Sequence, residues 1–156
     1  MLDSNAASAQ SAAKEPLQLE AKILLGDVRG RIDHMAVDLK RQRLFVAELG
    51  NDSVGVVDLA THSLVRTITG LNEPQGVGYE PSADILFVAN ARDGSVKLFE
   101  GNAYKATGQI ELGGDADNIR VDTAAGRVVV GGLSLEAALK EAHKRVEDIH
   151  RIRSRS

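Results

Sequence analysis

The sequence predicts an all-β protein made of repeated modules, with one α-helix added at its C-terminal end. A strand-like block returns at a spacing of 42 residues, and its three copies open at Met35, Val77 and Ile119. Within each block, short runs of β-branched and aromatic residues alternate with turn-forming residues, which is typical of strands. Four antiparallel strands in about 42 residues match one β-propeller blade. The expected fold class is therefore an incomplete β-propeller of four-stranded antiparallel blades.

Residues 1–16 form the first segment and read MLDSNAASAQSAAKEP. The segment is polar, rich in small residues and without hydrophobic periodicity, so we expect a disordered leader. Leu19–Leu25, with the sequence LEAKILL, precedes the first block at the distance at which an outer strand precedes the second. We therefore expect a strand there, and a partial propeller that covers residues 17–133.

Four strands are expected in the first repeat, at Met35–Asp38, Arg43–Glu48, Ser53–Asp58 and Leu64–Thr69. The residues between them are rich in Asn, Asp and Gly, which tolerate the left-handed backbone of tight turns. The second repeat follows the same pattern and ends with an outer strand at Thr107–Leu112. The third repeat keeps the register for two inner strands and stops after Gly132. The chain should thus hold about two and a half to three blades.

Residues 134–156 change to a helical pattern that begins at Ser134, a suitable N-cap. The apolar residues of this pattern are spaced by four and three, and they are Leu135, Leu139, Ala142, Val146 and Ile149. We expect this amphipathic helix to cover the open side of the last blade, with a partner helix or self-association as alternatives. An accidental sequence from a shifted reading frame is a third interpretation. The basic end of the helix is expected to be a solvated tail, and its arginines are Arg151, Arg153 and Arg155.

Two segments, RLFVAELGNDSVGVVDL and ILFVANARDGSVKLFE, resemble the YVTN-type β-propeller repeat of YncE-like bacterial proteins. In that repeat an apolar triplet and an Ala-Asn pair precede a turn and a further strand. The resemblance implies a propeller of six or seven blades, a periplasmic or extracytoplasmic location, and often no defined catalytic activity. The first residues lack a complete signal peptide, so the chain is expected to be cytoplasmic if it is expressed as written.

The length of the chain raises a question about ring closure. The smallest usual propeller has four blades, and four repeats of this size would need about 168 residues, whereas the chain has 156. The chain is therefore expected to be a fragment, a subunit of an assembled ring, or a protein whose helix covers the exposed face. An open blade edge has unpaired backbone groups and favours association, so self-association through this edge or through the helix is a possible partner mode.

Polar residues recur at the entry to each innermost strand, where they are expected to face a central channel. The ligand-binding candidates are Asp33, His34, Gln75, Asp117 and Asn118. Oxygen ligands that converge on an axis can bind Ca²⁺, and Asp33, Asp117 and Asn118 are the candidate ligands. His34 is then the candidate catalytic base beside a metal-activated water. The alternative, which we favour, is that these groups accept hydrogen bonds from backbone N–H groups at turns.

Composition limits the function further. A net charge of -3 gives no general case for nucleic-acid binding, and the absence of cysteine excludes disulfides and thiolate metal sites. No run approaches the roughly 18 apolar residues of a membrane-spanning helix. The sequence also lacks a phosphate-binding loop and a nucleophile elbow. We therefore expect a non-catalytic binding or interaction module for a protein or small ligand, with no cofactor. The alternatives are a calcium-dependent, lactonase-like hydrolase and a truncated product without independent activity.

Overall fold

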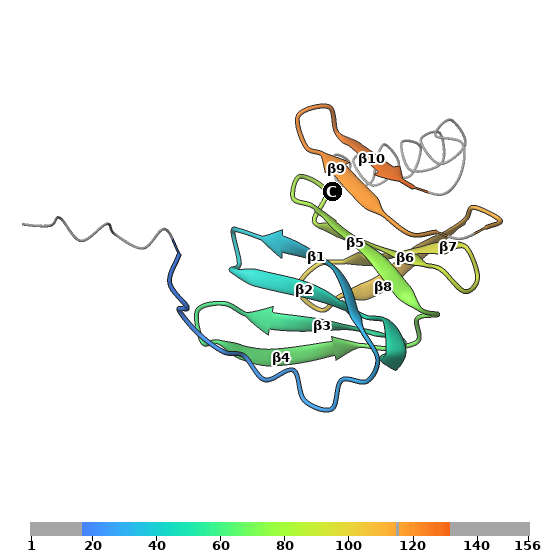
Figure 1. The fold of residues 1–156 in the computed structure, drawn as a ribbon. Coiled ribbons are helices and arrows are strands. Elements are labelled where there is room, and N and C mark those ends of the chain that lie inside the picture. The colour runs from blue at the N-terminus through green and yellow to red at the C-terminus, as the bar shows by residue number, and fades with distance from the viewer. Residues whose placement is uncertain (1–16, 115, 132–156) are drawn as a thin grey trace, which may run out of the picture.

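The computed structural model describes residues 17–114 and 116–131, and this part of the chain forms three antiparallel sheets (Figure 1). The strands of the first sheet are β1 (Ile32–Asp38), β2 (Arg43–Glu48), β3 (Ser53–Asp58) and β4 (Ser63–Ile68), with a short 3-10 helix, η1 (Leu49–Asn51), between β2 and β3. Those of the second are β5 (Pro74–Glu80), β6 (Ile85–Asn90), β7 (Ser95–Glu100) and β8 (Lys105–Glu111). The third has β9 (Ile119–Asp122) and β10 (Arg127–Val130). Each sheet follows chain order, so the four-stranded antiparallel sheets predicted for the first two repeats and the two inner strands predicted for the third are confirmed.

The first and second blades share even their irregularities. Phe45 pairs with Val56 across β2 and β3, and Phe87 pairs with Leu98 across β6 and β7 at the same repeat positions. The pairing of the innermost strands with their neighbours shifts register near the start of β1 and again near the start of β5. The sequence repeat is therefore a repeat of backbone geometry as well as of residue type.

Turns also recur at fixed repeat positions. The residue before the second strand of each blade has a positive φ, at Gln42, Asp84 and Gly126. The turn between the second and third strands contains Asp52 in the first blade and Gly94 in the second, again with positive φ. Asp and Gly adopt this backbone readily, whereas Gln42 adopts it because the geometry of the turn overrides its side-chain preference.

The hydrophobic cores lie between blades and not inside them. The first core joins Phe45 and Val56 of the first blade to Leu86 and Val88 of the second. The second core joins Phe87 and other residues of the second blade to residues of the third blade, which include Ile119, Val128 and Val130. The innermost strands β1, β5 and β9 consequently lie next to one another, as Figure 1 shows.

Two glycines in β5 allow the third blade to approach closely. A Cβ atom on Gly76 would lie 2.0 Å from the carbonyl oxygen of Asp117, and one on Gly78 would lie 2.4 Å from Cγ2 of Ile119. Real Cβ atoms do not make such contacts. The two glycines therefore determine how near β9 lies to β5.

The expected strand at Leu19–Leu25 is wrong, since residues 17–31 contain no strand before the start of β1. An outer strand needs the third strand of its own blade as a neighbour, and the described residues offer none ahead of β1. The segment is held instead by Asn51, whose Oδ1 accepts a hydrogen bond from the Arg29 N–H (2.8 Å). Asn51 Nδ2 also donates to the carbonyl oxygen of Asp27 (3.0 Å).

Smaller differences concern strand ends. β1 begins three residues before the expected Met35, β4 is displaced by one residue from Leu64–Thr69, and β8 begins and ends before Thr107–Leu112. The expected leader and the expected C-terminal helix lie outside the described residues. Within the described ranges, no helix has the length and apolarity needed to cross a membrane.

Candidate functional site

The residues predicted to face a channel lie at one end of the three innermost strands. Asp33 and His34 are in β1, Gln75 is in β5, and Asp117 and Asn118 immediately precede β9. Asp33, Gln75 and Asp117 occupy the same position of successive repeats. The structure therefore places all five candidates at equivalent points of neighbouring strands.

Several of these side chains already have partners. Asp33 Oδ2 lies 2.9 Å from Arg31 Nη2. Asp33 Oδ1 lies 3.0 Å from Nδ1 of His34, but this buried nitrogen makes no hydrogen bond to the described residues. Arg120 Nη1 donates a hydrogen bond to Oδ1 of Asn118. The contacts of Asp33 are with residues near it at the start of β1, and the contact of Asn118 is with Arg120 in β9.

The backbone around Asp117 and Asn118 closes the two-stranded third sheet. The Asp117 N–H donates to the carbonyl oxygen of Gly131 (3.3 Å), and the Gly131 N–H donates to that of Asn118 (2.6 Å). These are main-chain bonds, so the turn does not need either side chain to satisfy it. The favoured interpretation, in which these side chains cap backbone groups, is therefore not supported by the hydrogen bonds of the described residues at this turn.

A calcium ion would need oxygen ligands that are free to coordinate it. Asp33 is paired with Arg31, and Asn118 Oδ1 accepts from Arg120, so an ion would have to replace both contacts. Among the residues the structure describes, no group of three or more His, Asp or Glu side chains is placed to hold a metal ion. Calcium binding, and the role of His34 as a base, stay predictions.

A more extensive polar arrangement lies at the other end of the innermost strands, in the turns that follow them. Each of these strands ends in an acidic residue at the same repeat position: Asp38, Glu80 and Asp122. Asp38 Oδ1 accepts hydrogen bonds from the N–H groups of Lys40 (3.0 Å) and Arg41 (3.2 Å). The acidic residues thus hold the turns in shape.

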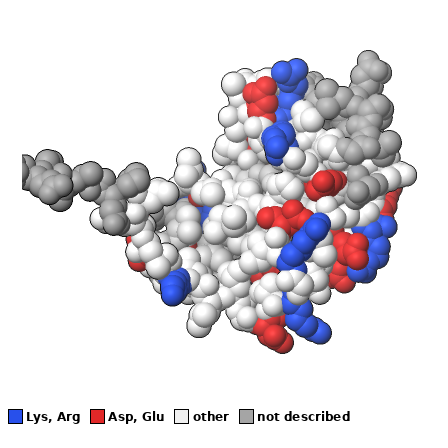
Figure 2. Space-filling model, viewed as in Figure 1, with Lys and Arg blue, Asp and Glu red and all other residues white. Residues whose placement is uncertain are grey.

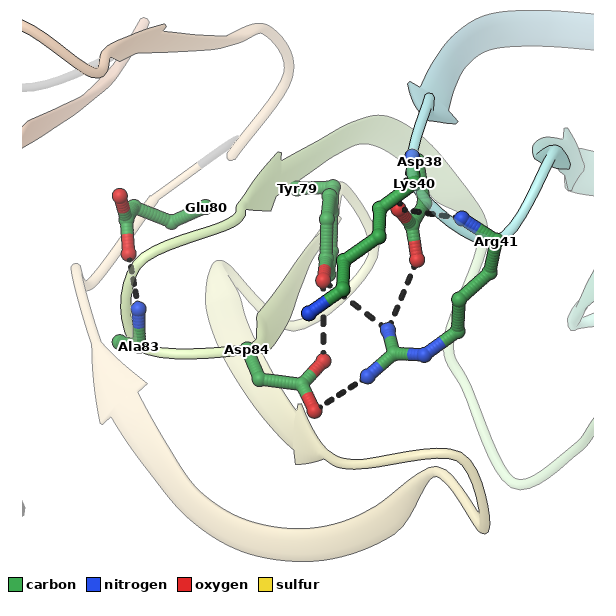
Figure 3. A network of polar contacts seen from close by, with 7 residues as sticks. All are labelled: Asp38, Lys40, Arg41, Tyr79, Glu80, Ala83 and Asp84. Carbon is green, nitrogen blue, oxygen red and sulfur yellow. Dashed lines mark hydrogen bonds and ion pairs between the residues drawn. The ribbon is translucent and has the colours of Figure 1, made fainter.

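The other two acidic residues act in the same way. Glu80 Oε2 accepts from the Ala83 N–H (2.6 Å), as Figure 3 shows, and Asp122 Oδ1 accepts from the Ala125 N–H (3.0 Å). A carboxylate that accepts backbone N–H bonds is stabilised in its charged form. Hydrogen bonds from the Ala125 N–H, with a smaller contribution from Arg127, accordingly lower the pKa of Asp122.

Arg41 links the turn of the first blade to that of the second (Figure 3). Its Nη1 donates to Asp38 Oδ2 (2.7 Å) and to the Tyr79 hydroxyl (3.0 Å), and its Nη2 donates to Asp84 Oδ2 (2.5 Å). The Tyr79 hydroxyl in turn donates to Asp84 Oδ1 (2.9 Å). One guanidinium therefore joins two carboxylates and a phenol from two blades, and we call these four residues the Arg41 network.

The network changes the acidity of its members. The hydrogen bond to Asp84 raises the pKa of Arg41 above its already high value, with Asp38 adding to the effect, so the guanidinium stays charged. Burial, and then the hydrogen bond to Asp84, raise the pKa of Tyr79 to about 12. Arg41 therefore stays charged and Tyr79 stays protonated around neutral pH.

A hollow with a volume of about 390 Å³ lies beside the Arg41 network. Residues 37–40 of the first blade line it together with Tyr79 and Pro81 of the second and Thr123 of the third. Its walls are mostly apolar, and Lys40 and Thr123 add polar groups. The hollow can accept a small molecule with an apolar body and one polar group.

The sequence contains part of the signal for this second arrangement. The recurrence of Asp38, Glu80 and Asp122 every 42 residues is visible without a structure. Arg41 and Asp84 give no such signal, because Ala83 and Gln42 occupy their counterpart positions. The contact between blades depends on a pair of residues that occurs once among these repeats.

Comparison with known proteins supports the fold. No protein-family model matches the chain, and no curated protein does. Hydrazine synthase from Kuenenia stuttgartiensis matches with a TM-score of 0.60 and 19% identity, over 72% of this chain and 32% of the other. The WD40 β-propeller domain of Doa1 matches with a TM-score of 0.54 and 17% identity, over 68% of this chain and 34% of the other.

These likenesses define the class of protein as a β-propeller fold and carry no activity with them, because the identities are low. The chain spans about a third of the length of each of the two matched structures. Within the described residues, the fold consists of two complete blades and the two inner strands of a third.

Proposed function

We propose that the protein is a non-catalytic binding module with YVTN-type repeats, and that it binds a second copy of itself through the first blade. One observation carries the proposal. Among the described residues, every large hydrophobic residue that is exposed belongs to the N-terminal segment or to the first blade. They are Leu17, Leu19, Leu24, Ile32, Met35, Val37, Leu39 and Val65.

The contact surface is the face of the first blade that points away from the second blade, which we call the open face. Met35 and Val37 on β1 belong to it. Their counterparts in the second blade are Val77 and Tyr79, which pack into the core between the first and second blades. Met35 is 59% exposed, whereas Val77 is 4% exposed. The open face therefore has the residue pattern of a blade contact, and no described residues form a neighbouring blade on it.

The distribution of charge supports the same surface. In Figure 2 the left part of the visible surface shows few charged side chains, and most of the charged side chains in this view lie to its right. Apolar area that is not opposed by charge gains free energy when it leaves water, at roughly 25 cal/mol per Å². Two open faces can meet about a two-fold axis, because such an interface uses the same patch twice.

The repeat type and the location of the protein are proposals that rest on the sequence resemblance. The segments RLFVAELGNDSVGVVDL and ILFVANARDGSVKLFE fall on strands two and three of the first and second blades. An extracytoplasmic location follows from the same resemblance and is testable by cell fractionation.

Light scattering over a series of protein concentrations tests the proposed function. The chain is expected to reach the mass of a dimer, and Met35→Lys is expected to return it to a monomer because an ammonium would be buried in the interface. Gln109→Lys, at an exposed position of the outer strand β8 in the second blade, is the control and should leave the dimer intact. A monomer at every concentration, or equal effects of the two variants, would overturn the proposal.

A further inference from the structure

We propose that the hollow beside the Arg41 network is a binding site for a small monocarboxylate with an apolar body. The inference goes beyond self-association, because it assigns a ligand to a site within one chain. The hollow lies where the turns that follow β1, β5 and β9 come together, so all three blades contribute to it. Its volume of about 390 Å³ is in the range that is typical of ligand sites.

The walls of the hollow select an apolar ligand body. Val37 and Leu39 of the first blade and Pro81 of the second supply aliphatic surface, and Tyr79 supplies an aromatic ring. The ring is fixed in position, because its hydroxyl both accepts from Arg41 and donates to Asp84. A rigid apolar wall of this kind favours a preformed site.

The two carboxylates at the hollow already have partners. Both oxygens of Asp38 are occupied, by backbone N–H groups of the turn and by the Arg41 guanidinium. Asp84 holds Arg41 and Tyr79 through its two oxygens. The two carboxylates are therefore held in place and are not free to turn towards a ligand.

Lys40 is the remaining charged residue that lines the hollow. Its backbone N–H belongs to the turn, and Figure 3 shows no hydrogen bond or ion pair from its ammonium to the other residues drawn. Because the lysine stem is flexible, the ammonium can move to meet a carboxylate of the ligand. Thr123 adds a hydroxyl that can donate a second hydrogen bond to the same group. A short alkyl chain with a carboxylate at one end fits both the apolar walls and these two donors.

Titration with sodium hexanoate, followed by amide NMR spectra of the full chain, tests the proposal. Saturable shifts are expected in residues 37–40, at Tyr79 and at Thr123. Hexanol and hexylammonium, which share the alkyl body, are expected to bind at least about tenfold more weakly, because they lack the charge-assisted contact with Lys40. Equal binding of hexylammonium, or shifts that lie elsewhere, would overturn the proposal.

A pair of lysine variants separates the site from general charge effects. Lys40→Gln is expected to weaken hexanoate binding by about tenfold and to leave the binding of hexanol unchanged. Lys105→Gln changes an exposed lysine at the start of β8 and should have no effect. If Lys40→Gln bound hexanoate as tightly as the parent chain, the assignment of Lys40 would be wrong.

The hollow shares Val37 and Leu39 with the first blade's exposed apolar surface, so the titration is repeated on the Met35→Lys variant. Hexanoate is expected to bind this variant as it binds the parent chain, whether or not the parent chain dimerises. Loss of binding in Met35→Lys would show that the site needs a second copy, which contradicts a site within one chain. The light-scattering result decides the proposed function separately.

Discussion

Arg41 of the first blade and Asp84 of the second form an ion pair in which Nη2 and Oδ2 lie 2.5 Å apart. The same guanidinium also contacts Asp38, whose side chain is only 1% exposed. Hydrophobic packing between two sheets can tolerate small slips, whereas a guanidinium that bonds three oxygen atoms fixes one geometry. The Arg41 network therefore sets the position of one blade on the next at the turn end of the innermost strands.

Arg41→Met is expected to lower the free energy of unfolding by about 2 kcal/mol, because it leaves the buried Asp38 carboxylate without its cation. Urea unfolding measures the change. Arg92→Met is the matched control: Arg92 contacts Glu73 and Asp52, but it is exposed, so its loss should cost much less than the loss of Arg41. A larger loss for Arg92→Met than for Arg41→Met would contradict the role assigned to the network.

Glu48→Asn is expected to stabilise the protein by about 1 kcal/mol. Glu48 is 2% exposed, its Oε2 accepts from the Ser53 hydroxyl (2.6 Å), and its Oε1 has no hydrogen-bond partner among the described residues. Its counterpart Asn90 accepts from the Asn72 N–H (3.0 Å) and donates to the Ser95 hydroxyl (3.0 Å). The substitution gives the first blade the satisfied arrangement of the second.

The reverse change is the control for this prediction. Asn90→Glu places an unmatched carboxylate at the position of the second blade that is now satisfied, and thermal unfolding should show a lower midpoint. If Glu48→Asn and Asn90→Glu both raised stability, or both lowered it, satisfaction of the buried polar group would not determine stability at this position in both blades.

Gly78→Ala is expected to loosen the third blade, because the added methyl group would lie 2.4 Å from Cγ2 of Ile119. Overpacking of this kind costs about 1–3 kcal/mol. Amide hydrogen exchange should show faster exchange in β9 and β10 and little change in β3 and β4. The double variant with Ile119→Ala removes the nearest clashing atom and leaves Cγ2 of Val121 at 2.9 Å, so it should restore part of the protection in β9 and β10. Failure of the second substitution to restore any protection would exclude this clash as the cause.

Ionisation of the tyrosines provides a pH-dependent prediction, since the chain has two tyrosines and no tryptophan. Burial is the main reason that the pKa of both Tyr79 and Tyr104 is raised, to about 12 in the case of Tyr79. The folded state keeps these protons at pH values at which the unfolded chain has lost them. Stability is therefore expected to be unaffected below about pH 10 and to fall as the pH rises towards 12.

The absorbance of tyrosinate measures this titration directly. Tyr104→Phe leaves Tyr79 as the reporter, and its midpoint should stay near pH 12. Asp84→Asn removes the carboxylate that accepts from the Tyr79 hydroxyl, so the midpoint should move down towards the ordinary tyrosine pKa of 10.0. An unchanged midpoint in Asp84→Asn would show that this hydrogen bond does not hold the proton.

The sequence predicted strands correctly where a strand and the strands that pair with it recur in each repeat. Arg43–Glu48 and Ser53–Asp58 match β2 and β3 residue for residue, because alternating apolar residues and turns mark both ends. Leu19–Leu25 has equally strong strand character and forms no strand, since strand formation also needs a partner for its backbone groups. Local pattern identifies a strand only when the pairing strand is present.

The same limit applies to the candidate sites, since only residues that recur in each repeat could be placed from the sequence. Asp33, Gln75 and Asp117 could be placed at one end of the innermost strands from their spacing alone. The contact of Arg41 with Asp84 could not be predicted, because it crosses between repeats and its residues do not recur. The repeat pattern predicts contacts that every blade makes, and it does not predict a contact that forms between only two of the blades.

Each hydrophobic core lies between two blades, so one core is built from the facing halves of two consecutive sequence repeats and not from a single repeat. Duplication of one 42-residue segment within the array would therefore add one complete core and leave the existing cores unchanged. Deletion of one segment would remove one core and bring two similar faces together. Such an array can gain or lose modules during evolution without redesign of its interior.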